Sequence, residues 1–327
     1  MTDDSLQRLI GSYMATRQQV YSFAWQGGEP SLMGYRFFKR VTDLQQSCAA
    51  PGSRISNGLQ TNGTLITPDF ARHLSDYRML TGISIDGPEE IHNRYRKRAD
   101  GDGSYAKVVR GLELLQNAGV EVNVLVLVSR ANVDTPEEVY RHLKRLGLTY
   151  HQYIPCVETD NAGNLLPYAI NGREWGEFCT RIFREWLRQD MYTVSIRNFD
   201  AVLQKLVHNQ TAMCTMGRNC NDYFAVEYNG DVYPCDFFVE PELLLGNIHE
   251  NSWGEMRKSH SYRRFGRKKC EWDPACSRCE YLDLCGGDCP KHRPPGGVSR
   301  LCPGIRYFYR ATLETFKKIA NNLKARM

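Results

Sequence analysis

Hydrophobic and polar residues follow one another in blocks along the first two-thirds of the chain. Short apolar runs of strand length are each followed by an amphipathic stretch of helix length. We expect strands at 20–25, 54–60, 79–85, 122–128 and 150–155. We expect helices at 35–46, 68–77, 105–118, 135–146 and 174–189. Strands that alternate with helices predict right-handed βαβ units and a parallel sheet, and therefore an α/β fold.

The predicted strands are continuously apolar, as in a sheet that is buried on both faces. Three of them end in polar, glycine-rich turns, at residues 26–30, 61–63 and 86–88. An α/β barrel carries its chemistry at such strand ends. Five strands are too few to close a barrel, so the pattern alone also allows an open doubly wound sheet.

The pattern changes at about Cys214, where short, turn-rich segments replace the alternation of strands and helices. Residues 224–228 and 231–235 flank an Asn229-Gly230 turn and predict a β-hairpin. A last helix is expected at 304–324. The length of 327 residues allows one large α/β domain and a smaller module.

Composition and charge exclude several classes of protein. Charged residues make up 24% of the chain and the net charge is +5, so the clusters at 94–98 and 263–269 are read as solvated surface. No nucleic-acid-binding motif is present, and no apolar run approaches the roughly 18 residues of a membrane span. The first residues are polar and carry no secretory signal. We therefore expect a cytoplasmic protein that binds neither nucleic acid nor membrane.

Nine of the 12 cysteines lie between Cys214 and Cys302, which indicates disulfides or metal ligands. The absence of a secretory signal and the size of the chain argue against disulfides. Cys276-x2-Cys279 suits zinc as well as iron, so spacing alone leaves zinc ribbons and iron–sulfur centres equally open.

The turn Gln26-Gly27-Gly28-Glu29-Pro30 directly follows a predicted strand. Its glycines let the backbone approach a ligand closely, and Glu29 with the amides can hold a zwitterionic group. Taken alone, a plain βα turn is the more common reading.

In combination these motifs resemble the radical S-adenosylmethionine (SAM) enzymes that carry a SPASM domain. The nearest resemblance is to the anaerobic sulfatase-maturating enzyme family, and it rests on residues 23–30, 84–88 and Tyr233-Pro-Cys-Asp236. It extends from about Val20 to Cys302. It implies a partial (β/α)6 barrel at 1–205, followed by an iron–sulfur SPASM domain with a C-terminal helix at 206–327. The resemblance also favours iron–sulfur centres strongly over zinc as the metal that the cysteines bind.

One family motif has no counterpart. The family carries Cys-x3-Cys-x2-Cys after its first barrel strand, where three thiolates hold the [4Fe–4S] cluster that binds SAM. The first cysteine here is Cys48, on a predicted helix. We therefore expect that the first βα unit of the barrel is missing, by truncation more than by evolved loss, and that this chain is inactive unless the unit is restored.

The resemblance implies roles for individual residues. The SAM contacts are Gln26, Gly27, Gly28, Glu29, Asn62, Ser84 and Arg96. One auxiliary [4Fe–4S] cluster takes Cys214, Cys220, Cys235 and Cys289, and a second takes Cys276, Cys279, Cys285 and Cys302. Asp236 matches the family's proposed catalytic acid/base. For Asp86 a pocket role and a turn-stabilising role are equally favoured. The remaining thiols, Cys48, Cys156, Cys179 and Cys270, are read as packing or spare.

The implied reaction is oxidation of a Cys or Ser of an unfolded sulfatase polypeptide to Cα-formylglycine by SAM radical chemistry. The implied partners are that polypeptide and an electron donor such as flavodoxin or ferredoxin. Three alternatives remain: another SPASM radical SAM enzyme that modifies peptides, a catalytically dead iron–sulfur protein that binds peptides or transfers electrons, and a zinc-binding interaction protein.

Overall fold

The computed structural model describes residues 1–326. Internal contacts divide the chain into two compact units, each assembled from three segments. The first unit contains residues 1–82, 110–122 and 219–269. The second contains residues 83–109, 123–218 and the chain from Cys270 onward.

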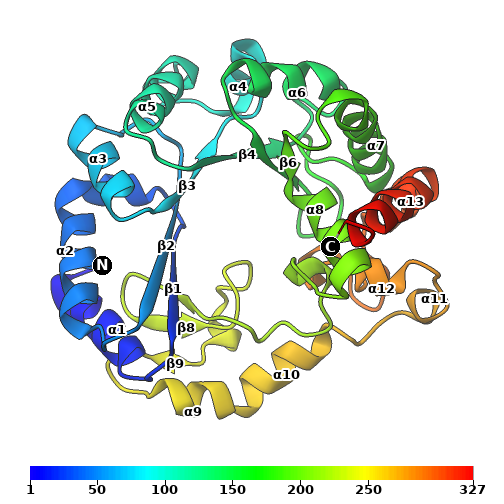
Figure 1. Ribbon diagram of the computed structural model, residues 1–327. Helices are drawn as coiled ribbons and strands as arrows, with labels where there is room; N and C mark the ends of the chain where they lie inside the picture. Colours follow the sequence, from blue (N-terminus) through cyan, green and yellow to red (C-terminus); the bar gives the residue numbers. More distant parts are fainter. Residues whose placement is uncertain (327) are drawn as a thin grey trace. The chain divides into compact units, whose positions relative to one another are not determined.

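Six strands form one sheet in the order β1-β2-β3-β4-β5-β6 (Figure 1). They are β1 (Val20–Trp25), β2 (Arg54–Thr61), β3 (Leu80–Ser84), β4 (Val122–Val128), β5 (Tyr150–Pro155) and β6 (Ser195–Ile196). The pairs β1–β2, β4–β5 and β5–β6 are parallel. The α/β class is confirmed. A doubly wound sheet reverses its strand order partway, whereas this order follows the chain as in a barrel-type sheet.

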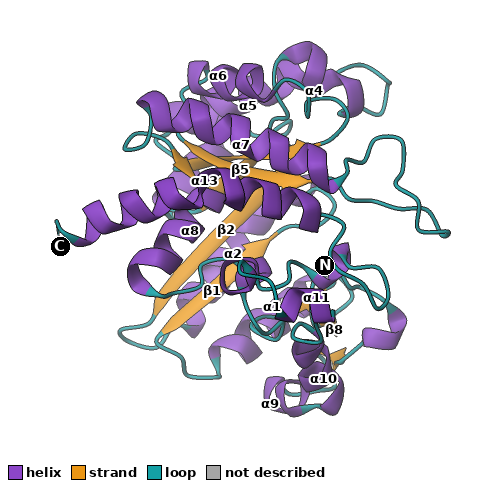
Figure 2. Ribbon diagram, turned by 90° about the vertical axis from the view of Figure 1, so that its right-hand side faces the viewer, coloured by secondary structure: helices purple, strands orange, loops and turns teal. Residues whose placement is uncertain are grey.

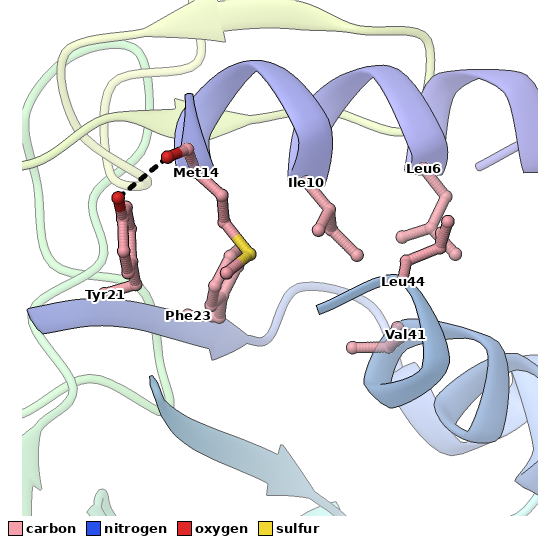
Figure 3. Packing of buried hydrophobic residues seen from close by; sticks show 7 residues of the cluster. All are labelled: Leu6, Ile10, Met14, Tyr21, Phe23, Val41 and Leu44. Atoms are coloured by element: carbon pink, nitrogen blue, oxygen red, sulfur yellow. Dashed lines mark hydrogen bonds between the residues drawn. The ribbon is translucent and has the colours of Figure 1, made fainter. Parts of the chain in front are cut away.

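Three helices of the first unit are connected by β1 and β2: α1 (Asp3–Met14), α2 (Gly34–Cys48) and α3 (Pro68–Asp76). A core cluster joins α1, β1 and α2 (Figure 3). Its members are Leu6, Ile10, Met14, Tyr21, Phe23, Val41 and Leu44. The buried hydroxyl of Tyr21 donates to the carbonyl of Met14, so the ring packs without an unsatisfied polar atom. Each buried Leu or Ile contributes about 1.5–3 kcal/mol.

The predicted hairpin is present in the same unit. Antiparallel β7 (Ala225–Val226) and β8 (Asp231–Tyr233) flank the Asn229-Gly230 turn, and β9 (Gly246–Asn247) pairs with β8. Helices α9 (Trp253–Lys258) and α10 (His260–Lys268) follow. Leu9 of α1 packs with Val232, Ile248 and Met256, and so joins the N-terminal helix to the hairpin.

The second unit contains most of the remaining helices. They are α4 (Glu89–Tyr95), α6 (Pro136–Arg145), α7 (Gly172–Gln189), α8 (Arg197–His208), α11 (Pro274–Ser277), α12 (Leu282–Cys285) and α13 (Cys302–Lys324), and α5 (Tyr105–Asn117) has residues in both units. Figure 2 shows α7 beside α13. A Cβ on Gly304 would lie 1.6 Å from the carbonyl oxygen of Gly172, and one on Gly176 would lie 2.4 Å from that of Gly304. Only glycine permits this approach of the two backbones.

Several elements were not predicted. The helices α1, α4 and α8 occupy stretches to which no element was assigned, and α9 and α10 occupy a region that was expected to be turn-rich. The two-residue β6 is too short to show any periodicity. In α1 the buried positions Leu6, Leu9, Ile10 and Met14 have helical spacing, but polar residues surround them. Over the described residues, no helix combines the length and apolar composition that crossing a membrane requires.

Candidate functional site

A cavity of about 1100 Å³ lies within the first unit. The end of β1 and the turn after it line one wall, from Ser22 to Pro30. Tyr223 and Phe224, which precede β7, line another part, together with Trp253 of α9. The cavity thus brings the glycine-rich turn and the start of the hairpin to one place, although nearly 200 residues separate them in the chain.

The glycines of this turn have a backbone conformation that other residues adopt only with strain. The φ angle is +87° at Gly27 and +54° at Gly28. A Cβ at either position would meet no atom within 4 Å, so the requirement is conformational and leaves open space above the backbone. Both residues are exposed at the cavity wall. The turn can therefore present backbone groups to a ligand.

Glu29 links the turn after β1 to the turn after β2. Its Oε1 accepts hydrogen bonds from the amide and hydroxyl of Ser31, at 3.0 and 2.5 Å, and from the hydroxyl of Thr61 at 2.6 Å. Its Oε2 accepts from the amide of Asn62 at 2.6 Å. A carboxylate offers about four acceptor positions, two on each oxygen. Oε2 therefore keeps capacity for a further donor, such as an ammonium group.

The side chain of Asn62 is used within its own turn. Its Oδ1 accepts from the amide and the hydroxyl of Thr64, at 2.9 and 2.7 Å. This is the local hydrogen bonding by which Asn stabilises turns. Asn62 therefore shapes the loop that meets Glu29. Direct contact of either residue with SAM stays a prediction.

A hydrogen-bonded group connects the turn with the residues after β8. The side-chain amide of Gln26 donates to Oδ2 of Asp236 at 2.7 Å. The hydroxyl of Tyr223 donates to Oδ1 of Asp236 at 2.8 Å and lies 3.2 Å from Sγ of Cys235. Oδ1 also accepts from the Cys235 thiol at 3.5 Å, so all the donors to Asp236 are neutral. The side chain is nonetheless exposed, so it remains accessible to a substrate.

Burial shifts the ionisation of two of these groups. It raises the pKa of Cys235 to about 11, so the unligated residue is a thiol at neutral pH. Burial, reinforced by the hydrogen bonds to Cys235 and Asp236, also raises the pKa of the Tyr223 hydroxyl far above its usual value. Tyr223 therefore acts as a donor over the whole physiological range. Were Cys235 to ligate iron, as predicted, it would lose this proton.

The residues after β3 belong to the second unit and are arranged differently. Ser84 is half-buried at the end of the strand. Asp86 is 6% exposed and accepts two hydrogen bonds from the guanidinium of Arg96, at 2.5 and 3.1 Å. It also accepts from the amide of Leu127 at 2.8 Å. Asp86 is therefore held by a cation and a backbone amide of the protein itself, and a role in the pocket stays a prediction.

His92 completes this buried network. The amide of Asp86 donates to its Nδ1 at 3.3 Å, and its Nε2 lies 3.0 Å from the hydroxyl of Ser104, which itself donates to the carbonyl of Arg96. The ring is therefore neutral, with its proton on Nε2. Burial lowers its pKa to about 4. The Asp86–Arg96 pair leaves the expected contact between Arg96 and SAM as a prediction.

The predicted cluster ligands are distributed over both units. Cys220 and Cys235 belong to the first unit, whereas Cys214, Cys289 and the whole second set belong to the second. In the second set, Cys276 and Cys279 are close enough to Cys302 that, after burial, their charges contribute to raising its pKa. That Cys276, Cys279 and Cys302 share one cluster stays a prediction.

The donor chemistry fits iron–sulfur clusters. Among residues 1–326 no three metal-binding side chains are close enough to hold one ion. A [4Fe–4S] cube places its four ligands on different irons, so that finding concerns single-ion sites only. The buried indole nitrogen of Trp272 lacks an acceptor among the described residues. A cluster sulfur near the second cysteine set would supply one.

Sequence reasoning missed Tyr223. Gln26 and Asp236, predicted separately, are in contact, and so are Glu29 and Asn62. Tyr223 belongs to no motif, and it contacts Asp236 only because the hairpin folds back on itself. The signal available in the sequence was its position 12 residues before Cys235, on the other side of the predicted Asn229-Gly230 turn.

Two family models match the chain. The model of the radical SAM superfamily matches residues 1–143. The SPASM model, described as an iron–sulfur cluster-binding domain, matches residues 214–280 and includes five of the eight predicted ligands. The radical SAM and SPASM matches imply iron–sulfur clusters.

Relatives of known activity match nearly the whole chain. The serine-type anaerobic sulfatase-maturating enzyme of Bacteroides thetaiotaomicron is 35% identical over 98% of this chain and 81% of its own length. The cysteine-type enzyme of Clostridium perfringens is 32% identical over 99% of this chain and 90% of its own length.

A solved structure of native anSMEcpe with bound AdoMet is 31% identical and superposes with a TM-score of 0.93, over 98% of this chain and 90% of that one. The same protein with AdoMet and the Kp18Cys peptide also gives 0.93, over 98% and 91% of the two chains. The resemblance seen in the motifs is thus confirmed over the full length, and the chain belongs to the anaerobic sulfatase-maturating enzyme family, whose members are radical SAM oxidoreductases.

Proposed function

We propose that this protein oxidises a Cys or Ser side chain of an unfolded sulfatase to Cα-formylglycine by SAM radical chemistry. Relatives of both the serine type and the cysteine type support the reaction class. The solved structures of anSMEcpe with bound AdoMet and the Kp18Cys or Cp18Cys peptide support a peptide substrate. A sulfatase segment and an electron donor such as flavodoxin or ferredoxin are the partners that we propose.

The observation that carries the proposal is the contact between Gln26 and Asp236 beside the cavity. Oxidation of a serine to the aldehyde removes a hydrogen atom from the β-carbon, a proton from the hydroxyl and one further electron. Asp236 is the exposed carboxylate that can accept the proton. Gln26 orients it from the same turn whose glycines we propose to contact SAM.

The two auxiliary [4Fe–4S] clusters would be held by the two predicted sets of four cysteines, within a SPASM domain at 206–327 that follows a barrel domain at 1–205. When bound, they supply an acceptor for the second electron. The cluster that binds SAM is a different case. The 327 residues contain no Cys-x3-Cys-x2-Cys motif, so the residues present do not fit that cluster.

Mass spectrometry of a peptide substrate tests the proposal. A form of the protein to which the Cys-x3-Cys-x2-Cys segment has been restored would be incubated without oxygen with SAM, a reductant and a Cys-x-Pro-x-Arg peptide, with the serine form of the peptide in parallel. We expect the mass change of aldehyde formation, together with one 5′-deoxyadenosine per product. A crosslinked peptide would instead support the alternative of a different SPASM peptide-modifying enzyme.

The missing cysteine motif favours one second candidate, an iron–sulfur protein that binds a peptide or transfers electrons without radical chemistry. Iron analysis of the anaerobically reconstituted chain separates the two. About eight irons per chain with no cleavage of SAM would support this candidate, whereas about twelve would require a third cluster. Two zinc ions in a colourless protein would contradict both.

A further inference from the structure

The hydroxyl of Tyr223 lies between two groups with proposed roles. It is 2.8 Å from Oδ1 of Asp236 and 3.2 Å from Sγ of Cys235. The same Oδ1 is 3.5 Å from that Sγ. One phenol therefore contacts both the proposed proton acceptor and a proposed cluster ligand. Neither the family motifs nor the relatives assign a role to this residue.

The surrounding residues hold Tyr223 in this position. The hydroxyl of Tyr262 in α10 donates to the backbone carbonyl of Tyr223 at 2.7 Å. The ring of Phe224 stacks on the ring of Tyr262, with the centroids 4.6 Å apart. The backbone at Tyr223 is thereby fixed, and only two side-chain torsions determine where the hydroxyl lies.

The position of the Tyr223 hydroxyl matters because of what Asp236 and Cys235 can each accept or donate. A phenol has a single proton to donate, and a cysteine that ligates iron has lost its own proton and can only accept. Gln26 already serves Oδ2 of Asp236, so Tyr223 is the donor on the side that faces the sulfur. Hydrogen bonds to ligand sulfurs are one of the factors that set the potential of an iron–sulfur cluster.

We propose that Tyr223 is a positioning residue for the oxidation, which orients the Asp236 carboxylate and at the same time stabilises the reduced state of the cluster held by Cys235. The single phenol proton is shared between Oδ1 of Asp236 and Sγ of Cys235 in a three-centre hydrogen bond. Its partial positive charge favours the reduced cluster because reduction adds negative charge to the ligand sulfurs. The proposal rests on the part of the proposed function that makes Cys235 a cluster ligand.

The test is the midpoint potential of the two auxiliary clusters, measured on the iron-loaded full chain by redox titration followed by EPR. Tyr223→Phe keeps the ring and removes only the donor. We expect the potential of one cluster to become more negative while that of the other is unchanged. Tyr228→Phe is the matched control, because Tyr228 lines the same cavity and is 71% exposed. It should move neither potential.

A second variant guards against an effect of misfolding. Incorporation of 3,5-difluorotyrosine at position 223 preserves the shape of the side chain and makes the phenol a stronger hydrogen-bond donor. We expect the potential of the same cluster to shift in the opposite direction, to more positive values. A general loss of structure cannot produce shifts of opposite sign from these two changes. Unchanged potentials in both variants would overturn the proposal.

The outcome is separable from that of the proposed function, because the potentials are measured without any substrate. A shift without formylglycine formation by the form with the restored segment would leave the role of Tyr223 standing and reject the reaction. Formylglycine formation without a shift would reject the role of Tyr223 alone. A chain that binds no iron at Cys235 would contradict both.

Discussion

Asp86 and Asp236 each lie a few residues beyond a strand, the first after β3 and the second after β8, yet their surroundings are opposite. Asp86 is 6% exposed, and a guanidinium and a backbone amide occupy its oxygens. Asp236 is exposed, and its three donors are the neutral side chains of Gln26, Tyr223 and Cys235. Of the two, only Asp236 can readily exchange a proton with a substrate.

The comparison shows how the surroundings of a carboxylate that stabilises the fold differ from those of a carboxylate that can take part in proton transfer. A carboxylate in a protein interior stays ionised only if a cation or several hydrogen bonds stabilise its charge. Removal of such a partner lowers the free energy of unfolding. A group that must accept a proton needs donors that orient it without neutralising it. The two aspartates should therefore respond to the same substitution in different measurements.

The largest effect is expected for Asp236→Asn. The amide keeps the size of the side chain but cannot take up the proton. Formylglycine formation by the form that carries the restored Cys-x3-Cys-x2-Cys segment should therefore fall by about a hundredfold or more. The rate would be followed by mass spectrometry of the peptide product, while the iron content and the unfolding temperature stay at the wild-type values. Asp222→Asn makes the same charge change at a residue of the cavity wall and should cost far less activity. Equal losses in the two variants would contradict the role of Asp236.

Asp86→Asn should act on stability instead. It leaves the buried side of the Arg96 guanidinium without its counter-ion, so the free energy of unfolding should fall by about 3 kcal/mol. Denaturant titration measures this loss. Asp69→Asn breaks the pair with Arg72, whose side chains are 72% and 70% exposed, and should cost less than about 1 kcal/mol. A similar small cost at Asp86 would show that its network is not structural.

The stability of the second unit should also depend on pH through His92. Its pKa is lowered to about 4 in the folded protein, so between that value and its ordinary value near 6.5 the unfolded chain binds the additional proton. Stability therefore falls as the pH falls through this window, by about 2 kcal/mol between pH 7 and pH 5. His151, whose pKa is also lowered to about 4 by burial, adds to the effect. Denaturant titrations of wild type and His92→Gln should show a shallower pH dependence in the variant, and parallel curves would contradict the assignment.

The smallest effect is expected for Gln26→Ala. One hydrogen bond to a carboxylate is lost at an exposed site, so the rate of oxidation should fall by about tenfold. Gln18→Ala, on the same cavity wall, removes a hydrogen bond to Thr16 and should leave the rate close to wild type. A loss at Gln26 as large as that of Asp236→Asn would mean that the amide itself participates in the chemistry.

Much of the fold could be predicted from the sequence because apolar strands and amphipathic helices carry local signals. The ranges of β1, β4 and β5 were predicted to the residue. The helix α1 could not be, because its apolar stripe becomes meaningful only when it packs on β1 and α2. The surroundings of Asp86 could not be predicted for a similar reason. Its ion-pair partner Arg96 lies ten residues further along the chain, and the sequence does not show that folding brings the two side chains together.

The most direct test of the proposed site is a crystal structure of the anaerobically prepared protein with anomalous data collected above and below the iron absorption edge. We predict an iron peak bonded to Sγ of Cys235, with the Asp236 carboxylate held between Gln26 and Tyr223 beside it. A peak that follows the zinc edge instead, or a Cys235 sulfur without any metal in iron-replete protein, would contradict it.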